Sequence, residues 1–124
     1  MEWLAKQGIG SILTLTVDPL PPEFTKGVGV VTGHVPMKDH EPPAVDALTR
    51  AVDFVIEQRE AGRAVLVHCL AGEGRTGCTL AAYAIAEGNV SADDAMAALR
   101  KLKPEFVEWR QEIAVRDFAS SRKM

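Results

Sequence analysis

The stretch that decides the fold is AVLVHCLAGEGRTG, residues 64–77. Its first four residues are wholly apolar, which predicts a short strand in a buried parallel sheet. Residues 75–87 predict a helix that Gly88 ends. The intervening residues 69–74 form a glycine-containing loop. A strand that passes through such a loop into a helix is a building unit of α/β proteins.

Before this unit, the apolar pattern predicts two more strands and one more helix. Residues 9–17 and 28–35 are rich in Ile, Leu, Thr and Val, which favour strands. Residues 36–43 predict a loop, and residues 44–61 repeat apolar side chains at helical spacing. The apolar face of this helix comprises Val45, Leu48, Val52, Val55 and Ile56. Because strands and helices alternate, we expect an α/β fold with a mostly parallel central sheet flanked by helices.

After residue 90, two further helices are predicted. Ser91, with Asp94 three residues later, is a signal for the start of a helix. A last helix is expected to begin at Pro104. The side chains predicted to point inward from these helices are Ala95, Met96, Leu99, Leu102, Phe106, Trp109, Ile113 and Phe118. A chain of 124 residues is the size of one domain, so residues 1–124 are treated as a single domain.

The overall charge and the cysteine content narrow the classes of function. A net charge of −3 provides no general basic field, which argues against nucleic acid or an anionic membrane as the main partner. Two cysteines, Cys69 and Cys78, are fewer than a secreted domain of this size usually carries. No stretch resembles a membrane span or a signal peptide. The expectation is a cytoplasmic protein with reduced thiols.

The loop over residues 69–74 has the composition of a phosphate site with a catalytic cysteine. A phosphate dianion binds backbone N–H groups at a helix N-terminus, and glycines let the backbone curl around it. The same positive environment favours the thiolate form of Cys69. Arg75 offers a planar fork for two phosphate oxygens. The alternative is a buried structural cysteine beside an ordinary turn, which the complete pattern disfavours.

The pattern His-Cys-x-x-Gly-x-x-Arg-Thr-Gly over residues 68–77 resembles the signature of protein tyrosine and dual-specificity phosphatases. Residues 13–16, 39–43 and 99–104 resemble the small atypical dual-specificity phosphatases, so the similarity covers essentially the whole chain. The resemblance implies a protein tyrosine phosphatase-like fold and a phosphoric monoester hydrolase without cofactor or metal. Relative to the family, the chain starts inside the helix before its first strand and lacks the first N-terminal elements. We therefore expect a monomer or weak self-association.

Chemistry and the resemblance together assign the catalytic roles. Cys69 attacks phosphorus and forms a thiophosphate intermediate. Asp39 is the preferred general acid, with Glu41 as its rival, because the resemblance implies that the acid of the family lies at this position. Strand geometry agrees, since the Asp39 loop and the Cys69 loop both leave the carboxyl ends of predicted strands. Arg75 binds the phosphate and, more strongly, the transition state. In the family the hydroxyl at the position of Thr76 hydrogen-bonds the cysteine sulfur, although this threonine could also simply start the helix.

Other residues are expected to support this chemistry. His68 orders the loop through hydrogen bonds, and Gln111 aligns with a family glutamine that could position water, with a solvated helix residue as the equal alternative. Cys78 is either a core residue or a partner that traps oxidised Cys69 as a disulfide. Residues 19–26 form the expected pocket rim. The residues expected to bind substrate alongside Arg75 are Leu70, Ala71, Gly72, Glu73 and Gly74.

Three functions remain open at this point. The main hypothesis is a protein phosphatase whose partner is a phosphoprotein or phosphopeptide carrying phosphotyrosine, with phosphoserine and phosphothreonine also open. The second is a phosphatase of RNA 5′-triphosphate or of a small phosphorylated metabolite or lipid. Glu73 and the acidic balance count against RNA and lipid, because a glutamate in the loop repels a highly anionic group. The third, a non-catalytic phosphate-binding module, ranks low because Cys69, Arg75 and Asp39 are all present.

Overall fold

The computed structural model describes residues 8–21, 23, 29–69 and 74–122. In chain order the elements are β1 (Ile9–Thr14), β2 (Val31–His34), α2 (Val45–Glu60), β3 (Ala64–His68), α3 (Gly74–Gly88), α4 (Ala92–Leu102), the 3-10 turn η2 (Trp109–Gln111) and α5 (Glu112–Ser121). The helix end predicted at residues 2–6 lies outside the described residues.

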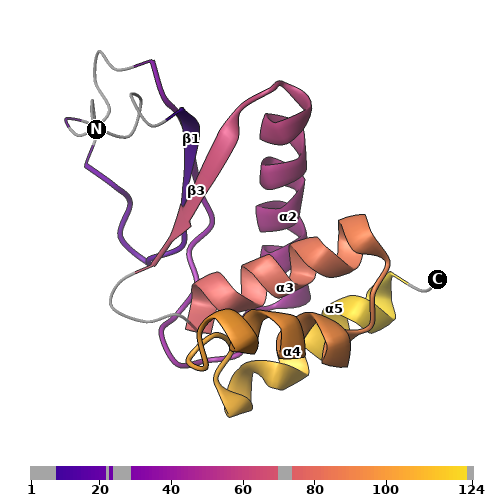
Figure 1. Cartoon of the computed structure of the whole chain (residues 1–124). Coiled ribbons are helices and arrows are strands. Elements are labelled where there is room, and N and C mark those ends of the chain that lie inside the picture. The colour runs from indigo at the N-terminus through magenta and orange to yellow at the C-terminus, as the bar shows by residue number, and fades with distance from the viewer. Residues whose placement is uncertain (1–7, 22, 24–28, 70–73, 123–124) are drawn as a thin grey trace.

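The described strands form one parallel sheet in the order β2-β1-β3, which confirms the predicted α/β class. Backbone pairing continues beyond the strand ends, because the Leu15 N–H donates to the His68 carbonyl at 3.0 Å and the Met37 N–H donates to the Leu15 carbonyl at 2.9 Å. Helices α2 to α5 gather on one side of β1 and β3 (Figure 1). Because all three strands are parallel, the chain leaves them at the same edge of the sheet.

β1 and β2 are shorter than predicted, and β3 is less buried than predicted. β1 ends at Thr14 rather than at residue 17, because the Thr16 hydroxyl donates to the Asp18 carbonyl at 2.6 Å and closes a local turn. β2 begins at Val31 rather than at residue 28. β3 is only half-buried, since it has a pairing partner on one side alone within the described sheet.

Helix α2 closes the core over the sheet as its spacing predicts. Leu48, Val52 and Val55 are buried. On the facing sheet, Gly33 of β2 lies so close to α2 that a Cβ atom there would come within 2.6 Å of the Phe54 ring. A glycine in the strand thus makes room for an aromatic side chain of the helix.

The start of α4 agrees with the sequence, and its end does not. The Asp94 N–H donates to the Ser91 hydroxyl at 3.1 Å, which confirms the predicted cap. Ala95 and Met96 are buried, but Leu102 is 81% exposed and its predicted inward position is wrong. Leu102 is the last residue of α4, where the next residue, Lys103, turns to an extended conformation.

The last helix begins eight residues later than predicted, at Glu112 instead of Pro104. Residues 103–108 form an irregular segment in which Val107 has φ 62°. The Arg100 guanidinium donates to the carbonyls of Phe106 and Val107, and thereby satisfies backbone groups that a helix would pair internally. Because the helix is interrupted, the apolar residues predicted to share one buried face do not all point to the core. Phe118 is fully buried, whereas Trp109 and Ile113 are 77% and 58% exposed, so their predicted burial is wrong.

The contact between α3 and the irregular segment leads to a stability prediction for Gly77. A Cβ atom at Gly77 would lie 2.6 Å from the Val107 backbone nitrogen and 3.0 Å from the Phe106 Cα. Because backbone atoms cannot rotate away, Gly77→Ala is expected to lower the free energy of unfolding by about 1–3 kcal/mol. Urea denaturation would measure this loss.

Gly88→Ala is the matched control for the Gly77 variant. It is the same substitution in the same helix, but its nearest contact would be an ordinary 3.7 Å to Val90 Cγ1. We expect nearly wild-type stability for this control. Equal stability of the two variants would contradict the packing argument.

Candidate active site

The site forms where the chain leaves the parallel strands, and Arg75 lies at its centre. Arg75, in the first turn of α3, is only 4% exposed. Its Nη1 donates to the Met37 carbonyl at 3.1 Å, and its Nη2 lies 3.6 Å from Asp39 Oδ1. The Asp39 loop therefore meets the start of α3 at one edge of the sheet. The parallel order of the predicted strands led us to expect this.

Cys69 lies directly after β3 and is half-buried. The Thr76 hydroxyl donates to its sulfur at 3.1 Å, the contact that the family resemblance implies. The first turn of α3 contains no acidic residue, so no carboxylate within that turn offsets the positive end of the helix dipole. This arrangement suits a sulfur that carries negative charge and an anion bound beside it.

His68 occupies the last position of β3, beside Cys69. Its Nε2 lies 2.9 Å from the hydroxyl of Thr14, which is the last residue of β1. Burial lowers the pKa of the His68 imidazole below its ordinary value. His68 is thus an uncharged hydrogen-bonding group at neutral pH, in keeping with its predicted role of ordering the loop.

Gln111 is fully buried, so the alternative of a solvated helix residue is wrong. Its side-chain oxygen accepts from the Glu108 N–H at 3.1 Å, and its side-chain nitrogen donates to the Glu41 carbonyl at 3.3 Å. A Cβ atom at Gly74 would lie 2.3 Å from this oxygen. Gln111 therefore packs directly against the start of α3, and any side chain at position 74 would have to displace the Gln111 amide group.

Cys69, Arg75 and Asp39 line one cavity of about 430 Å³. Residues 18–21 form one wall of it, which agrees with part of the predicted rim; residues 22 and 24–26 lie outside the described residues. Glu41 lines a different, smaller cavity of about 180 Å³. The geometry thus favours Asp39 over Glu41 as the carboxylate that reaches a group bound at Cys69.

Four of the residues predicted to bind substrate alongside Arg75 lie outside the part of the chain that the structure describes. These are Leu70, Ala71, Gly72 and Glu73. Four other cavity residues were not predicted as part of the site: Thr14, Thr16, Val17 and Asp18. The signal for them was present, because they lie at or next to the carboxyl end of the first predicted strand and so at the same sheet edge as the other loops.

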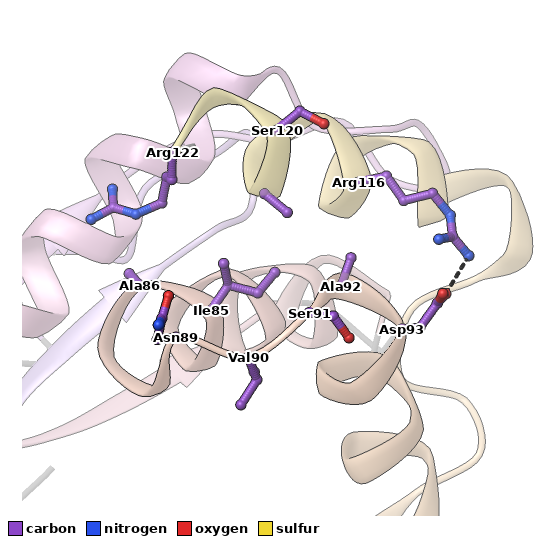
Figure 2. Close-up of a pocket in the computed structure, with 11 residues that line it drawn as sticks. Ile85, Ala86, Asn89, Val90, Ser91, Ala92, Asp93, Arg116, Ser120 and Arg122 are labelled. Carbon is purple, nitrogen blue, oxygen red and sulfur yellow. Dashed lines mark ion pairs between the residues drawn. The ribbon is translucent and has the colours of Figure 1, made fainter. Parts of the chain in front are cut away.

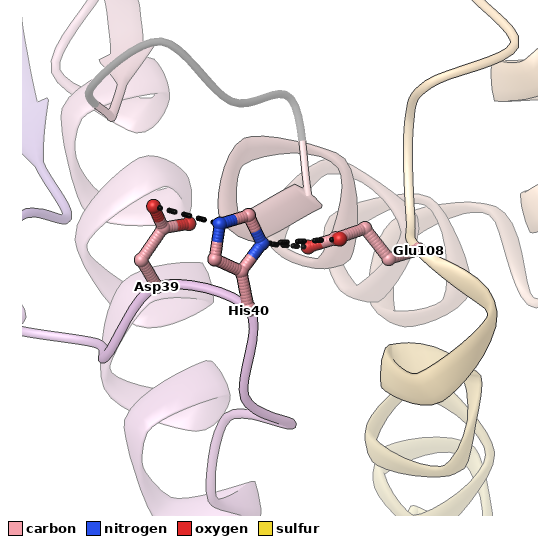
Figure 3. A group of neighbouring side chains, drawn as sticks. All are labelled: Asp39, His40 and Glu108. Carbon is pink, nitrogen blue, oxygen red and sulfur yellow. Dashed lines mark hydrogen bonds and ion pairs between the residues drawn. The ribbon is translucent and has the colours of Figure 1, made fainter.

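Asp39, His40 and Glu108 also form a group whose ligand atoms lie within 4.8 Å of one another. Figure 3 shows the imidazole between the two carboxylates, which approach opposite edges of the ring. Asp39 faces Nε2 and Glu108 faces Nδ1. One metal ion can bind only one of the two ring nitrogens, so the group forms a chain of ion pairs in which the carboxylates do not converge on a common point.

A separate cavity of about 470 Å³ lies between the end of α3, the start of α4, and α5 (Figure 2). At one side of it, Arg116 Nη2 pairs with Asp93 Oδ1 at 2.7 Å, and this hydrogen bond raises the pKa of Arg116. The cavity shares no lining residue with the Cys69 cavity. It is therefore not part of the candidate site.

The second cysteine, Cys78, is predicted to be chemically silent in the folded protein. It is fully buried in the core, and burial raises the pKa of its thiol to about 12. Since only the thiolate reacts, it should remain unmodified at pH 8, where the half-buried Cys69 is alkylated. Iodoacetamide labelling followed by peptide mass spectrometry would test this, with guanidinium-unfolded protein as the control in which both are labelled. Equal labelling of both cysteines in folded protein would be the contrary result.

Comparison with known proteins places the chain in a family. Residues 1–89 match the family described as "Polymorphic toxin system, DSP-PTPase phosphatase". The chain therefore belongs to the dual-specificity and protein tyrosine phosphatase family, and the resemblance carried by residues 68–77 is confirmed.

Individual relatives agree with this assignment. The chain is 32% identical over 105 residues to dual specificity protein phosphatase 12 of Rattus norvegicus, a match that covers 84% of this chain and 31% of that protein. It is 34% identical over 105 residues to dual specificity protein phosphatase Mpk3 of Drosophila melanogaster, covering 84% of this chain and 25% of that protein. The chain thus spans between a quarter and a third of the length of these relatives.

Solved structures share the fold. Tk-PTP in its active form superposes with a TM-score of 0.86 at 24% identity, covering 98% of this chain and 87% of that one. PTPMT1 superposes with a TM-score of 0.85 at 22% identity, covering 98% of this chain and 83% of that one. The predicted protein tyrosine phosphatase-like fold is confirmed. Within the described residues, no helix is both long and apolar enough to cross a bilayer.

Proposed function

We propose that the protein is a cysteine-dependent phosphatase that removes phosphate from phosphotyrosine in proteins, with phosphoserine and phosphothreonine as further substrates. The observation that carries this proposal is the single cavity lined by Cys69, Arg75 and Asp39, which come from separate segments of the chain. These groups are a nucleophile, a phosphate ligand and an acid, the three that phosphomonoester cleavage by a thiol needs. Relatives named as protein phosphatases support phosphoproteins as the substrate class.

In the first step the phosphate group binds between Arg75 and the N-terminus of α3. The sulfur of Cys69 attacks phosphorus, and the P–O bond to the leaving group breaks as the S–P bond forms. The electron pair of the broken bond stays on the leaving oxygen, which takes a proton from Asp39. The Arg75 guanidinium stabilises the charge on the non-bridging oxygens in the transition state.

In the second step water displaces the sulfur. Asp39, now ionised, accepts a proton from the water as its oxygen bonds to phosphorus. The S–P bond breaks and its electron pair returns to Cys69. The Thr76 hydroxyl, 3.1 Å from this sulfur, stabilises the departing thiolate by donating a hydrogen bond.

This chemistry also supports a location for the protein. A thiol nucleophile is lost when it is oxidised, so it works best where glutathione and thioredoxin keep cysteines reduced. Among the described residues, neither Cys69 nor Cys78 is in a disulfide. We therefore propose that the protein works in the cytoplasm. An activity assay under reducing and oxidising conditions should show turnover only with the reduced thiol.

The test is a phosphoenzyme assay on the wild-type protein. With p-nitrophenyl phosphate, we expect continuous release of phosphate. Rapid acid quenching during turnover should trap a peptide that contains Cys69 and is heavier by one phosphoryl group. Turnover with no covalent intermediate, or no turnover at all, would contradict the proposal.

A substrate panel then separates the substrate classes. We expect kcat/KM to be highest for phosphotyrosine peptides and lower for inositol phosphates and RNA 5′-triphosphate. One structural neighbour, PTPMT1, was crystallised with PI(5)P, which makes the inositol arm informative. Glu73→Lys should raise activity on inositol phosphates by reducing charge repulsion. If that activity is already high in the wild type and unchanged in the variant, the preference for protein substrates is wrong.

A further inference from the structure

The loop that carries Asp39 is tied to a segment far away in sequence, the turn that starts at Glu108. The His40 ring nitrogen Nδ1 lies 3.1 Å from both carboxylate oxygens of Glu108. On the opposite edge of the ring, Nε2 lies 3.4 Å from Asp39 Oδ2 (Figure 3). His40 therefore connects the carboxylate of the candidate acid to a carboxylate that does not line the Cys69 cavity.

A second contact joins the same two segments. Gln111, at the end of the turn, donates to the Glu41 carbonyl at 3.3 Å from a fully buried position. The backbone of His40, between these two contacts, has φ 64°, a left-handed conformation that non-glycine residues rarely adopt. Such a conformation persists where neighbouring contacts determine it, and the contacts to Glu108 and Gln111 are of this kind.

The geometry leaves one oxygen of Asp39 available for chemistry. His40 engages Oδ2, while Oδ1 is directed to Arg75, 3.6 Å away, and so to the cavity. Each ring nitrogen of His40 faces one carboxylate, so a ring N–H donates to the carboxylate on its own side. The contact with Glu108 on one edge of the ring thereby fixes which ring nitrogen faces Asp39.

From this geometry we infer that Glu108 is a positioning residue that, through His40, orients Asp39 for proton transfer to the leaving group. The inference rests on the proposed function, because it assigns a role in the acid step of that reaction. Glu108 itself does not touch the reacting atoms. Its effect must therefore depend on Asp39 and on how much the leaving group needs a proton.

The experiment compares three variants on aryl phosphates with leaving groups of different acidity. Glu108→Ala removes the distal carboxylate. His40→Asn removes the link, while asparagine tolerates the left-handed backbone at this position. Glu105→Ala is the matched control, because Glu105 is an exposed acid that lines the same cavity of about 570 Å³ as Glu108 and His40. Thermal denaturation of each variant checks that it is folded.

Glu108→Ala and His40→Asn are each expected to lower kcat on phenyl phosphate about 10-fold, since a small misplacement of a catalytic group costs up to about 10²-fold. On 2,4-dinitrophenyl phosphate, whose leaving group needs no proton, they should equal the wild type. Glu105→Ala should match the wild type on both substrates. An equal loss on both substrates, or no loss with folded His40→Asn protein, would overturn the inference.

A double-mutant cycle separates this inference from the function on which it rests. In the Asp39→Ala background, adding Glu108→Ala should cause no further loss on phenyl phosphate. A further 10-fold loss there would mean that Glu108 acts independently of Asp39, and the inference would fail while the phosphatase proposal stands. If Asp39→Ala alone behaves like the wild type on phenyl phosphate, the proposed acid step itself is wrong.

Discussion

Cys69→Ser is expected to reduce the turnover of p-nitrophenyl phosphate about 10⁶-fold, the size of loss seen when a covalent nucleophile is removed from a hydrolase. Serine retains the shape of cysteine and a group that can accept the hydrogen bond from Thr76, which donates to the Cys69 sulfur at 3.1 Å. It does not form an anion at neutral pH, so no covalent intermediate should form. Steady-state phosphate release would measure the loss.

Two controls make the result specific to the nucleophile. The variant should still bind phosphotyrosine peptide, measured by calorimetry, because Arg75 and the α3 N-terminus remain. Cys78→Ala removes the other cysteine, which is buried in the core, and should retain turnover. Retention of more than about 1% of activity by Cys69→Ser would contradict nucleophilic catalysis by this residue.

Asp39→Ala is expected to reduce kcat on phenyl phosphate by about 10²–10⁴-fold, the usual contribution of general acid–base catalysis. The Michaelis constant should stay nearly the same, because Arg75 and the N-terminus of α3, which bind the phosphate, remain in place. The measurement is the separate determination of kcat and KM over a range of phenyl phosphate concentrations. A rise in KM with unchanged kcat would show that Asp39 binds substrate rather than transferring a proton.

Glu41→Ala is the natural control for the Asp39 variant. Glu41 is an acid two residues away in the same loop, but it lines a different cavity from Cys69. Its contact with Gln111 uses the backbone carbonyl, which the substitution leaves in place. We expect nearly wild-type kcat. A loss as large as that of Asp39→Ala would make Glu41 the acid.

The parts of the fold that could be predicted are those determined by neighbouring residues. The Ser91 cap depends on a hydroxyl and an N–H three residues apart, and it is present at 3.1 Å. The meeting of the Asp39 loop and the segment after β3 followed from the parallel order alone. Even here the ends of strands were misplaced, because a side-chain hydrogen bond such as that from Thr16 to the Asp18 carbonyl ends a strand without changing its apolar pattern.

The parts that could not be predicted depend on contacts between distant residues. His40 and Glu108 are 68 positions apart, and each on its own has the sequence context of a solvated loop residue. The irregular segment before α5 is supported by the Arg100 side chain, whose hydrogen bonds to Phe106 and Val107 carry no periodic signal. The helical pattern after Pro104 therefore predicted a continuous helix and a buried Trp109.

The exposed position of Trp109 equips the protein with an optical reporter. The sequence contains two tryptophans, Trp3 and Trp109, so Trp3→Phe leaves a single indole. That indole is 77% exposed, follows Glu108 in the chain and lines a cavity together with Gly74 and His40. Its emission should therefore change when vanadate or phosphate occupies the site, so that stopped-flow fluorescence can time ligand arrival separately from chemistry.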